Sequence, residues 1–281
     1  MVAGLSPPGY SPSELALALR KINCMSLASE YKRQFEWRDW PPILNALPSL
    51  KEQTVIDLGC GVGDLAFELA TRGARVIGLD GNEELLLEAR SRQISNAEFR
   101  QADLRQLPDL GVEADGLWCS FAAAYFVDLP EVLSSWAKNL KPAGWIAVTE
   151  IDDLFGHEPL TDRTKELLHG YAEESLAARR YDFRMGRKLT GYLEKAGFSV
   201  SKTLAVKDQE LSFDGPAGPE VIDAWRDRFA RMNLLRDFCG PNWHQVQQEY
   251  LECLYHPDHK SLAKVCCCIA TKGKNPGTSS Y

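Results

Sequence analysis

The sequence predicts an α/β protein built around a seven-stranded, doubly wound sheet, and two observations carry that prediction. First, a β-branched apolar run at 54–58 leads into the glycine-rich turn 59–63, and a helical pattern follows at 64–72. Second, strand-like and helix-like segments keep alternating as far as residue 152, which is the order expected when helices cover both faces of a parallel sheet. Ligands bind at the carboxyl edge of such sheets.

The remaining elements of this core each have a local signal. We expect further strands at 75–79, 97–100, 116–120 and 145–149, and helices at 83–92 and 130–140. Asn82 is a suitable N-terminal cap for the first of these helices, and Asp128 for the second. The turn before the strand at 145–149 contains Ala143 and Gly144, and we expect Gly144 to adopt the left-handed conformation there.

The regular alternation stops after residue 152. Helical patterns at 162–180 and within 211–260 interrupt it, while a helix at 186–196 and strands at 199–206 and 263–270 complete the sheet. The insertions are rich in aromatic residues, and we expect them to form a lid. The predicted organisation is a helical cap at 1–50 with a helix at 13–25, a core at 51–152, insertions at 153–186 and 211–260 around a core helix and strand at 187–210, a last core strand at 261–272, and a polar tail at 273–281.

Composition and cysteine usage narrow the class of protein. The net charge of −7 disfavours a nucleic-acid partner, because such partners usually meet a basic face. No apolar run reaches the roughly 20 residues that span a bilayer, and Met1–Leu5 is too short for a secretory leader. The eight cysteines include no CxxC pair, so we expect reduced thiols and a cytoplasmic location. No metal is predicted, because Cys253, His256 and His259 have no evident fourth ligand.

One motif resembles a known family. The segment Asp57-Leu58-Gly59-Cys60-Gly61-Val62-Gly63 is similar to the first motif of the class I S-adenosylmethionine-dependent methyltransferases, whose sheet is Rossmann-like. The resemblance implies that the methyl donor is held at this turn, by Asp57, Gly59, Cys60, Gly61 and Gly63. Asp57 could instead bond the N–H groups of the loop itself.

The resemblance implies further donor contacts at the ends of the following strands. Asp80, with Gly81, follows the second strand, where the family uses an acid for both ribose hydroxyls. Asp103 and Leu104 follow the third strand, near the adenine, and Ser120 ends the fourth strand, near the methyl group. Asp80 could instead cap the next helix, and Asp103 could simply form a turn.

The family often closes over the donor with an N-terminal tyrosine and a basic residue. Tyr31 and Arg33 are the candidates in this sequence, with Arg33 pairing the methionine carboxylate.

A dinucleotide-dependent oxidoreductase of the NAD type is the main alternative. Its fingerprint is G-x-G-x-x-G, but here the third glycine comes one residue early, at Gly63, and Asp64 occupies the expected place. A carboxylate beside a pyrophosphate is electrostatically unfavourable. This favours a methyl donor, which carries no phosphate.

The resemblance implies methyl transfer by in-line displacement to a nitrogen or oxygen of a small molecule, such as a specialised metabolite. An acceptor hydroxyl would benefit from a general base. His157, Glu150 and Tyr125 follow or end strands at the ligand-binding edge and are the candidate catalytic residues. The aromatic lid suits an apolar or aromatic acceptor, or a cation held over rings. A non-catalytic binding protein on the same fold is a further alternative, and the oligomeric state and the acceptor stay open.

Overall fold

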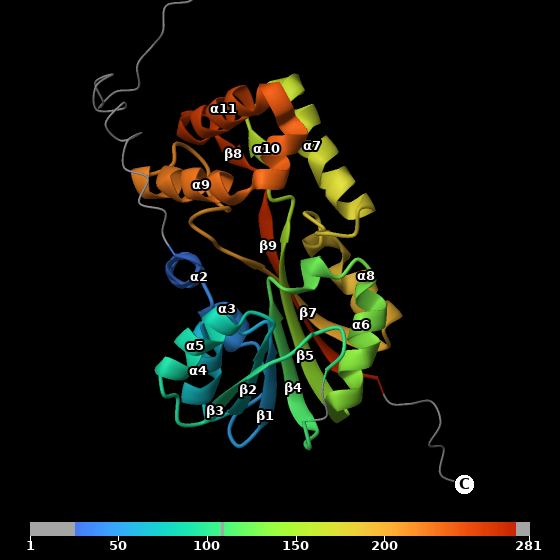
Figure 1. Cartoon of the computed structure of the whole chain (residues 1–281). Helices are drawn as coiled ribbons and strands as arrows, with labels where there is room; N and C mark the ends of the chain where they lie inside the picture. The colour runs from blue at the N-terminus through green and yellow to red at the C-terminus, as the bar shows by residue number, and fades with distance from the viewer. Residues whose placement is uncertain (1–25, 108–109, 274–281) are drawn as a thin grey trace, which may run out of the picture.

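The computed structural model describes residues 26–107 and 110–273, so the predicted helix at 13–25 and the tail beyond residue 273 lie outside the described residues. At its centre is a seven-stranded sheet of order β3-β2-β1-β4-β5-β9-β7 (Figure 1). The strands are β1 Thr54–Leu58, β2 Arg75–Asp80, β3 Ala97–Gln101, β4 Ala114–Ser120, β5 Leu140–Asp152, β7 Phe198–Val206 and β9 Lys264–Lys272. Strands β1 to β5 are mutually parallel, and β9 runs antiparallel between β5 and β7. The predicted seven-stranded α/β sheet is confirmed.

Helices cover both faces of this sheet. Helices α4 (Asp64–Thr71) and α5 (Glu83–Ser91) lie on one side, and α6 (Leu129–Trp136) and α8 (Leu189–Lys195) on the other (Figure 1). The central strands are therefore buried on both faces, which explains their unbroken apolar runs. The side chain of Asn82 accepts from the N–H groups of Glu84 and Leu85, so the predicted cap of α5 is confirmed.

Two local predictions were wrong. The carboxylate of Asp128 caps no N–H group of α6, because it pairs with Arg105 and Arg179 instead. In the turn before the central part of β5, Ala143 takes the left-handed conformation, with φ at 61°, and Gly144 does not. Gly144 is needed for close packing, since a Cβ there would lie 2.9 Å from the Leu140 side chain.

A helical layer rises above the carboxyl ends of the strands. It contains α7 (Asp162–Ala177), α9 (Pro219–Arg231), α10 (Asn233–Cys239) and α11 (Trp243–Tyr255), joined by the short strands β6 (His157–Glu158) and β8 (Lys260–Ser261). Trp225, Phe229 and Tyr250 form its buried centre, with ring centroids 4.8–5.6 Å apart. Helices α2 (Leu27–Glu36) and α3 (Pro41–Leu44) lie between α9 and the sheet (Figure 1). This layer, with α2, faces the ligand-binding edge, and we call the helices α7, α9, α10 and α11 the lid.

Two features expected from the sequence, unpaired cysteines and the absence of a membrane-spanning helix, can be compared with the described structure. The seven described cysteines are all free thiols, and most are buried. No helix in the described part of the chain is both long and apolar enough to cross a bilayer.

Candidate active site

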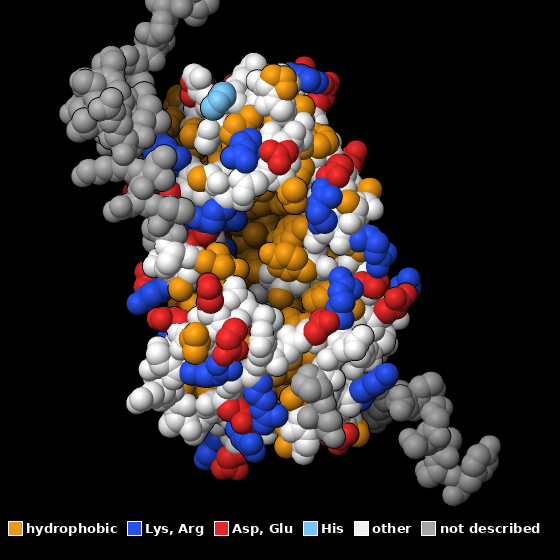
Figure 2. Space-filling view, viewed as in Figure 1, with side chains coloured by type: hydrophobic (Ala, Val, Ile, Leu, Met, Phe, Trp, Pro, Cys, Tyr) orange, Lys and Arg blue, Asp and Glu red, His pale blue; other side chains and the backbone are white. Residues whose placement is uncertain are grey.

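A cavity of about 1130 Å³ lies between the sheet edge and the lid. Figure 2 shows it as a hollow with hydrophobic side chains at its centre. Its volume exceeds the roughly 300–1,000 Å³ usual for a single small-ligand site, which leaves room for two ligands side by side. One half is formed by the strand-end loops of the core, and the other by α2 and the lid.

The glycine turn forms part of the cavity wall. Gly59, Gly61 and Gly63 have φ values of +81°, +50° and +79°, which L side chains rarely adopt. A Cβ on Gly59 would lie 2.6 Å from that of Ala122, and one on Gly61 would lie 3.3 Å from the Tyr31 ring. The missing side chains at Gly59 and Gly61 therefore let Ala122 and the Tyr31 ring pack directly against the turn.

Gly63, the last glycine of the turn, packs against neighbouring elements of the core. It is not among the described residues that line the cavity. A Cβ at this position would lie 3.0 Å from the Phe99 ring and 3.2 Å from Cβ of Ala89. Gly63 thus allows the start of α4 to pack against β3 and α5, and the structure assigns it no place against a ligand.

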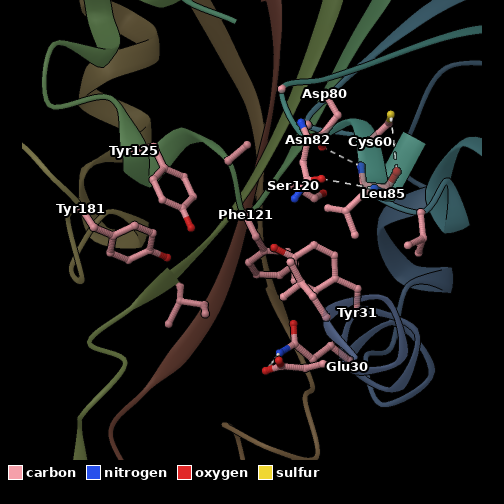
Figure 3. A pocket seen from close by; sticks show the side chains of 18 of the residues that line it. Glu30, Tyr31, Cys60, Asp80, Asn82, Leu85, Ser120, Phe121, Tyr125 and Tyr181 are labelled. Carbon is pink, nitrogen blue, oxygen red and sulfur yellow. Dashed lines mark hydrogen bonds between the residues drawn. The ribbon is translucent and has the colours of Figure 1, made fainter. Parts of the chain in front are cut away.

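Asp80 lies beside the glycine turn, as the sequence predicted. Its Oδ2 accepts from the N–H of Gly61 at 2.9 Å, and its Oδ1 accepts from the N–H of Asn82 at 2.8 Å (Figure 3). Parallel pairing of β1 with β2 brings the two strand ends together. Asp80 and Gly81 both line the cavity. Each carboxylate oxygen keeps a further lone pair for a ligand.

Asp57 presents a buried carboxylate to the same cavity. The residue is 2% exposed, and its Oδ2 has no hydrogen-bond partner among the described residues. Burial, with the nearby charge of Asp80, raises the pKa of Asp57 to about 8. A carboxylate in this position suits a cationic group, which would restore the ionised form.

The remaining predicted donor residues of the core also line the cavity. Cys60 follows Gly59 in the turn, Asp103 and Leu104 follow β3, and Ser120 ends β4. Oδ1 of Asp103 accepts from the N–H of Arg105 at 2.9 Å, so the predicted turn is present as well. The Ser120 Oγ is buried and has no hydrogen-bond partner within the described residues.

Tyr31 and Arg33 separate on helix α2. Tyr31 lines the cavity, and burial with neighbouring negative charge raises its pKa to about 12. Arg33 is not among the described lining residues, and its guanidinium lies 5.2 Å from the centroid of the Trp37 ring. The reason is helix geometry, because residues two positions apart point to nearly opposite sides. Arg33 is therefore not brought to the described wall that Tyr31 lines, and its pairing with the methionine carboxylate stays a prediction.

His157 is enclosed in the lid. It is 2% exposed, and its Nδ1 lies 2.9 Å from Nε2 of His259. The rings of Trp225 and Tyr250 flank it, with centroids 5.5 and 5.4 Å away. Burial, and then His259, lower the pKa of His157 to about 3. The long strand β5 carries the chain past the sheet edge before His157, so this residue does not reach the described cavity wall, contrary to expectation.

Glu150 and Tyr125 are linked through one turn. The Glu150 carboxylate is fully buried and accepts from the N–H of Ala124 at 2.9 Å, and burial raises its pKa to about 7. It supports the 3-10 turn Ala123–Tyr125 from behind and is absent from the described cavity wall. Tyr125 lines the cavity and is 54% exposed. Of the three predicted catalytic side chains, Tyr125 alone is among the lining residues that the structure describes.

Comparison with known proteins identifies the family. Residues 49–197, more than half of the 281-residue chain, match the profile of a family described as a methyltransferase domain. The chain belongs to the class I S-adenosylmethionine-dependent methyltransferase family. This membership overturns the NAD-type oxidoreductase alternative. Asp64 begins α4 and pairs with Arg92 at 2.5 Å, so its negative charge is compensated, and the family match rather than the charge of Asp64 decides between the two cofactors.

This methyltransferase is similar to two curated relatives and to one solved structure. It is 34% identical to trans-aconitate 2-methyltransferase of Deinococcus radiodurans over 36% of this chain and 39% of the relative. It is 29% identical to methyltransferase GfsG of Streptomyces halstedii over 61% of this chain and 60% of that relative. A crystal structure from Bacillus halodurans, 18% identical, superposes with a TM-score of 0.59 over 84% of this chain and 99% of that one. The chain thus spans between two fifths and three fifths of the length of these curated relatives, and the solved structure shows the shared fold.

The methyltransferase site also contains residues that sequence reasoning missed. Four arginines and a tyrosine line the lid half of the cavity: Arg38, Arg180, Arg228, Arg231 and Tyr181. Arginine in a charged amphipathic helix looks the same in sequence whether it faces solvent or a cavity. Tyr181 lies in the predicted connection between two helices, and no local pattern marks it as a wall residue.

Proposed function

We propose that this protein transfers a methyl group from S-adenosylmethionine to an oxygen or nitrogen of a small molecule. One observation carries the proposal. The glycine turn and Asp80, joined by the bond from the Gly61 N–H, form the wall of a cavity that continues into an aromatic chamber under the lid. A nucleoside in the first part would present its reactive end to the second.

The donor half of the cavity fits the proposed cosubstrate. Gly59 and Gly61 line this half, and neither places a side chain against a ligand. In this proposal Asp80 accepts from the ribose hydroxyls, Asp103 and Leu104 bound the adenine, and Ser120 lies near the sulfur. The orphaned Oδ2 of Asp57 faces the ammonium group of the methionine part. Tyr31 covers this half from α2.

The protein's own contribution to the reaction is positioning and exclusion of water. S-adenosylmethionine would supply a methyl group on a sulfonium, a leaving group that needs no protonation. The aromatic chamber and lid would hold an acceptor in line with it and keep water out, which raises the effective concentration of the reacting pair. His157 and Glu150 are enclosed elsewhere in the described structure, so neither is assigned a role as base.

The enclosed chamber supports a small-molecule acceptor. The relative from Deinococcus radiodurans is named for methylating trans-aconitate, which is a small molecule. Its similarity covers 36% of this chain, so the proposal takes from it the size class of the acceptor and not its identity.

Isothermal titration calorimetry on the full chain tests the proposal. S-adenosylmethionine and its by-product S-adenosylhomocysteine should both bind, whereas NADH should not. Replacement of Asp80 by Ala should abolish donor binding without unfolding the sheet, which far-ultraviolet circular dichroism checks. Folded wild-type protein that binds neither compound would end the proposal. Binding without by-product formation across amines, phenols and carboxylic acids would favour the non-catalytic alternative.

A further inference from the structure

The acceptor half of the cavity has a wall made mostly of rings. Its aromatic lining residues are Trp40, Phe121, Tyr125, Tyr171, Tyr181 and Phe183. Four of them touch in a chain: Tyr125 meets Tyr181 edge to face with centroids 4.9 Å apart, Tyr181 meets Phe183 at 4.8 Å, and Phe183 meets Tyr171 at 5.5 Å. Trp40 and Phe121 form a separate pair at 6.2 Å. Ring surfaces of this kind favour a flat, aromatic ligand, because offset and edge-to-face contacts add to simple burial.

Each of the four arginines that line this half has a carboxylate partner. Nε of Arg38 lies 2.6 Å from Oδ2 of Asp208, and Nε of Arg228 lies 2.9 Å from Oε1 of Glu210.

The other two arginines of this wall are also paired with carboxylates. Arg231 pairs with Glu30, and Arg180 pairs with Glu174. Because each guanidinium already faces a carboxylate, the four pairs carry no formal net charge. A carboxylate or an ammonium group would have to break into an existing pair and lose its own hydration.

The hydroxyls of Tyr125 and Tyr181 are polar groups of this wall that are available to a ligand. Figure 3 shows the hydroxyls of Tyr125 and Tyr181 pointing into the cavity, toward the side where Tyr31 and Phe121 lie. Within the described residues neither hydroxyl makes a hydrogen bond. Burial, and then the charge of Glu150, raise the pKa of both tyrosines, so both keep their protons and can donate.

The backbone holds these two tyrosines in place. The N–H of Asp182 donates to the carbonyl of Ala124 at 2.9 Å, which ties the Tyr181 segment to the turn that carries Tyr125. Glu150 anchors the same turn from below through the N–H of Ala124. The pair is therefore preorganised on two connected segments, which reduces the cost of ordering side chains on binding.

We propose that the methyl acceptor is an uncharged aromatic molecule, an inference that rests on the proposed function. Tyr125 and Tyr181 orient this acceptor by donating hydrogen bonds to its oxygen or nitrogen. Both tyrosines are positioning residues that touch the acceptor, and neither removes a proton. The methyl group passes from sulfur to the acceptor atom, the electrons of the broken S–C bond stay on sulfur, and the proton of the acceptor atom is released to solvent. The paired arginines make the site discriminate against acids and ammonium ions of the same shape.

Matched naphthalene probes test this inference by calorimetry on the full chain saturated with S-adenosylhomocysteine. The probes are 2-naphthol, 2-naphthoate and 2-naphthylmethylammonium, with 2-decalol as the saturated counterpart of the first. We expect 2-naphthol to bind at least tenfold more tightly than each of the other three. Tyr125→Phe and Tyr181→Phe should each weaken 2-naphthol about three- to tenfold, because each removes one hydrogen bond.

The controls separate this inference from the proposed function. Tyr192→Phe, on α8 and outside the cavity wall, should leave 2-naphthol binding unchanged. S-adenosylhomocysteine affinity should stay within about twofold in the Phe variants. Equal or tighter binding of either ionic probe, full 2-naphthol affinity in both Phe variants, or no binding of 2-naphthol by protein that binds S-adenosylhomocysteine would each overturn the inference. Failure to bind S-adenosylhomocysteine at all would instead remove the proposed function. The half-exposed Tyr125 side chain makes Tyr125→Phe the variant that retains the fold if Tyr181→Phe does not.

Discussion

The N–H of Gly61 donates to Oδ2 of Asp80 at 2.9 Å, so that the turn after β1 is held by the last residue of β2. The other oxygen of the same carboxylate holds the N–H of Asn82, the residue that caps α5. One side chain thus fixes the glycine turn, the start of a helix and the wall of the cavity between them. Any ligand contact by Asp80 depends on this arrangement.

Asp80→Asn should weaken S-adenosylhomocysteine binding by roughly 10- to 100-fold, measured by calorimetry. The amide places an NH₂ group against one of two N–H donors, which leaves a donor unsatisfied, at a cost of about 1–3 kcal/mol in the free energy of unfolding. Glu98→Gln, on the half-exposed β3 of the same sheet, is the control and should change neither quantity. Wild-type affinity in the Asp80→Asn variant would contradict the assigned contact.

Gly63→Ala should act on stability and not directly on the ligand. The new methyl group combines a left-handed backbone with contact at 3.0 Å to the Phe99 ring, and we expect unfolding in urea to become easier by about 2–4 kcal/mol. Gly197→Ala provides the matched control, because its φ is +86° but nothing lies within 4 Å of the added Cβ. The control should lose only about 1 kcal/mol, for backbone strain alone. Equal losses at the two positions would show that the packing contact is unimportant.

Acid should destabilise the lid through His157. Its pKa falls from 6.5 to about 3 on folding, so the folded state prefers the neutral ring. The resulting stability is complete above pH 6.5 and is lost as the pH falls from there toward 3. Between pH 7 and pH 5 this amounts to a loss of about 2 kcal/mol in the free energy of unfolding.

Urea denaturation at both pH values measures that loss. In the His157→Phe variant, the free energy of unfolding should differ much less between pH 7 and pH 5 than in the wild type. This holds whatever the stability of the variant at pH 7. His169→Asn, an exposed position on α7, should keep the wild-type difference. A His157→Phe variant with an unchanged pH dependence would assign the effect to other groups.

The pair Glu30–Arg231 should control how fast the by-product leaves. It joins α2 to α9 across the cavity wall, with side chains 5% and 29% exposed. Glu30→Gln leaves a partly buried guanidinium without its carboxylate, and we expect S-adenosylhomocysteine to dissociate about three- to tenfold faster in stopped-flow measurements. The swap Glu30→Arg with Arg231→Glu should restore part of the wild-type rate.

An exposed ion pair serves as the control for this effect. Arg163→Gln breaks the surface pair with Glu166 on α7 and should leave the dissociation rate unchanged. If Glu30→Gln and Arg163→Gln behave alike, α2 and α9 do not gate the cavity.

The sequence by itself determined the sheet and the half of the cavity that the strand-end loops form. The strand at 54–58, its glycine turn and the cap at Asn82 depend on local preferences, which a single sequence records directly. Asp80, Asp103 and Ser120 could be predicted to lie at one site because parallel strands bring their carboxyl ends to the same edge of the sheet. A residue at the end of such a strand therefore lies close to the cavity.

Only the tertiary structure decided the lid half. His157 meets His259 across 102 residues, and Arg231 meets Glu30 on a helix at the other end of the chain. No local pattern distinguishes these pairs from exposed or unrelated residues. The orientation of Arg33 could not be predicted either, although it lies in the same helix as Tyr31. Which face of α2 points at the cavity depends on what the helix packs against. Side chains on packed insertions take their direction from long-range contacts, and those contacts exist only in the folded chain.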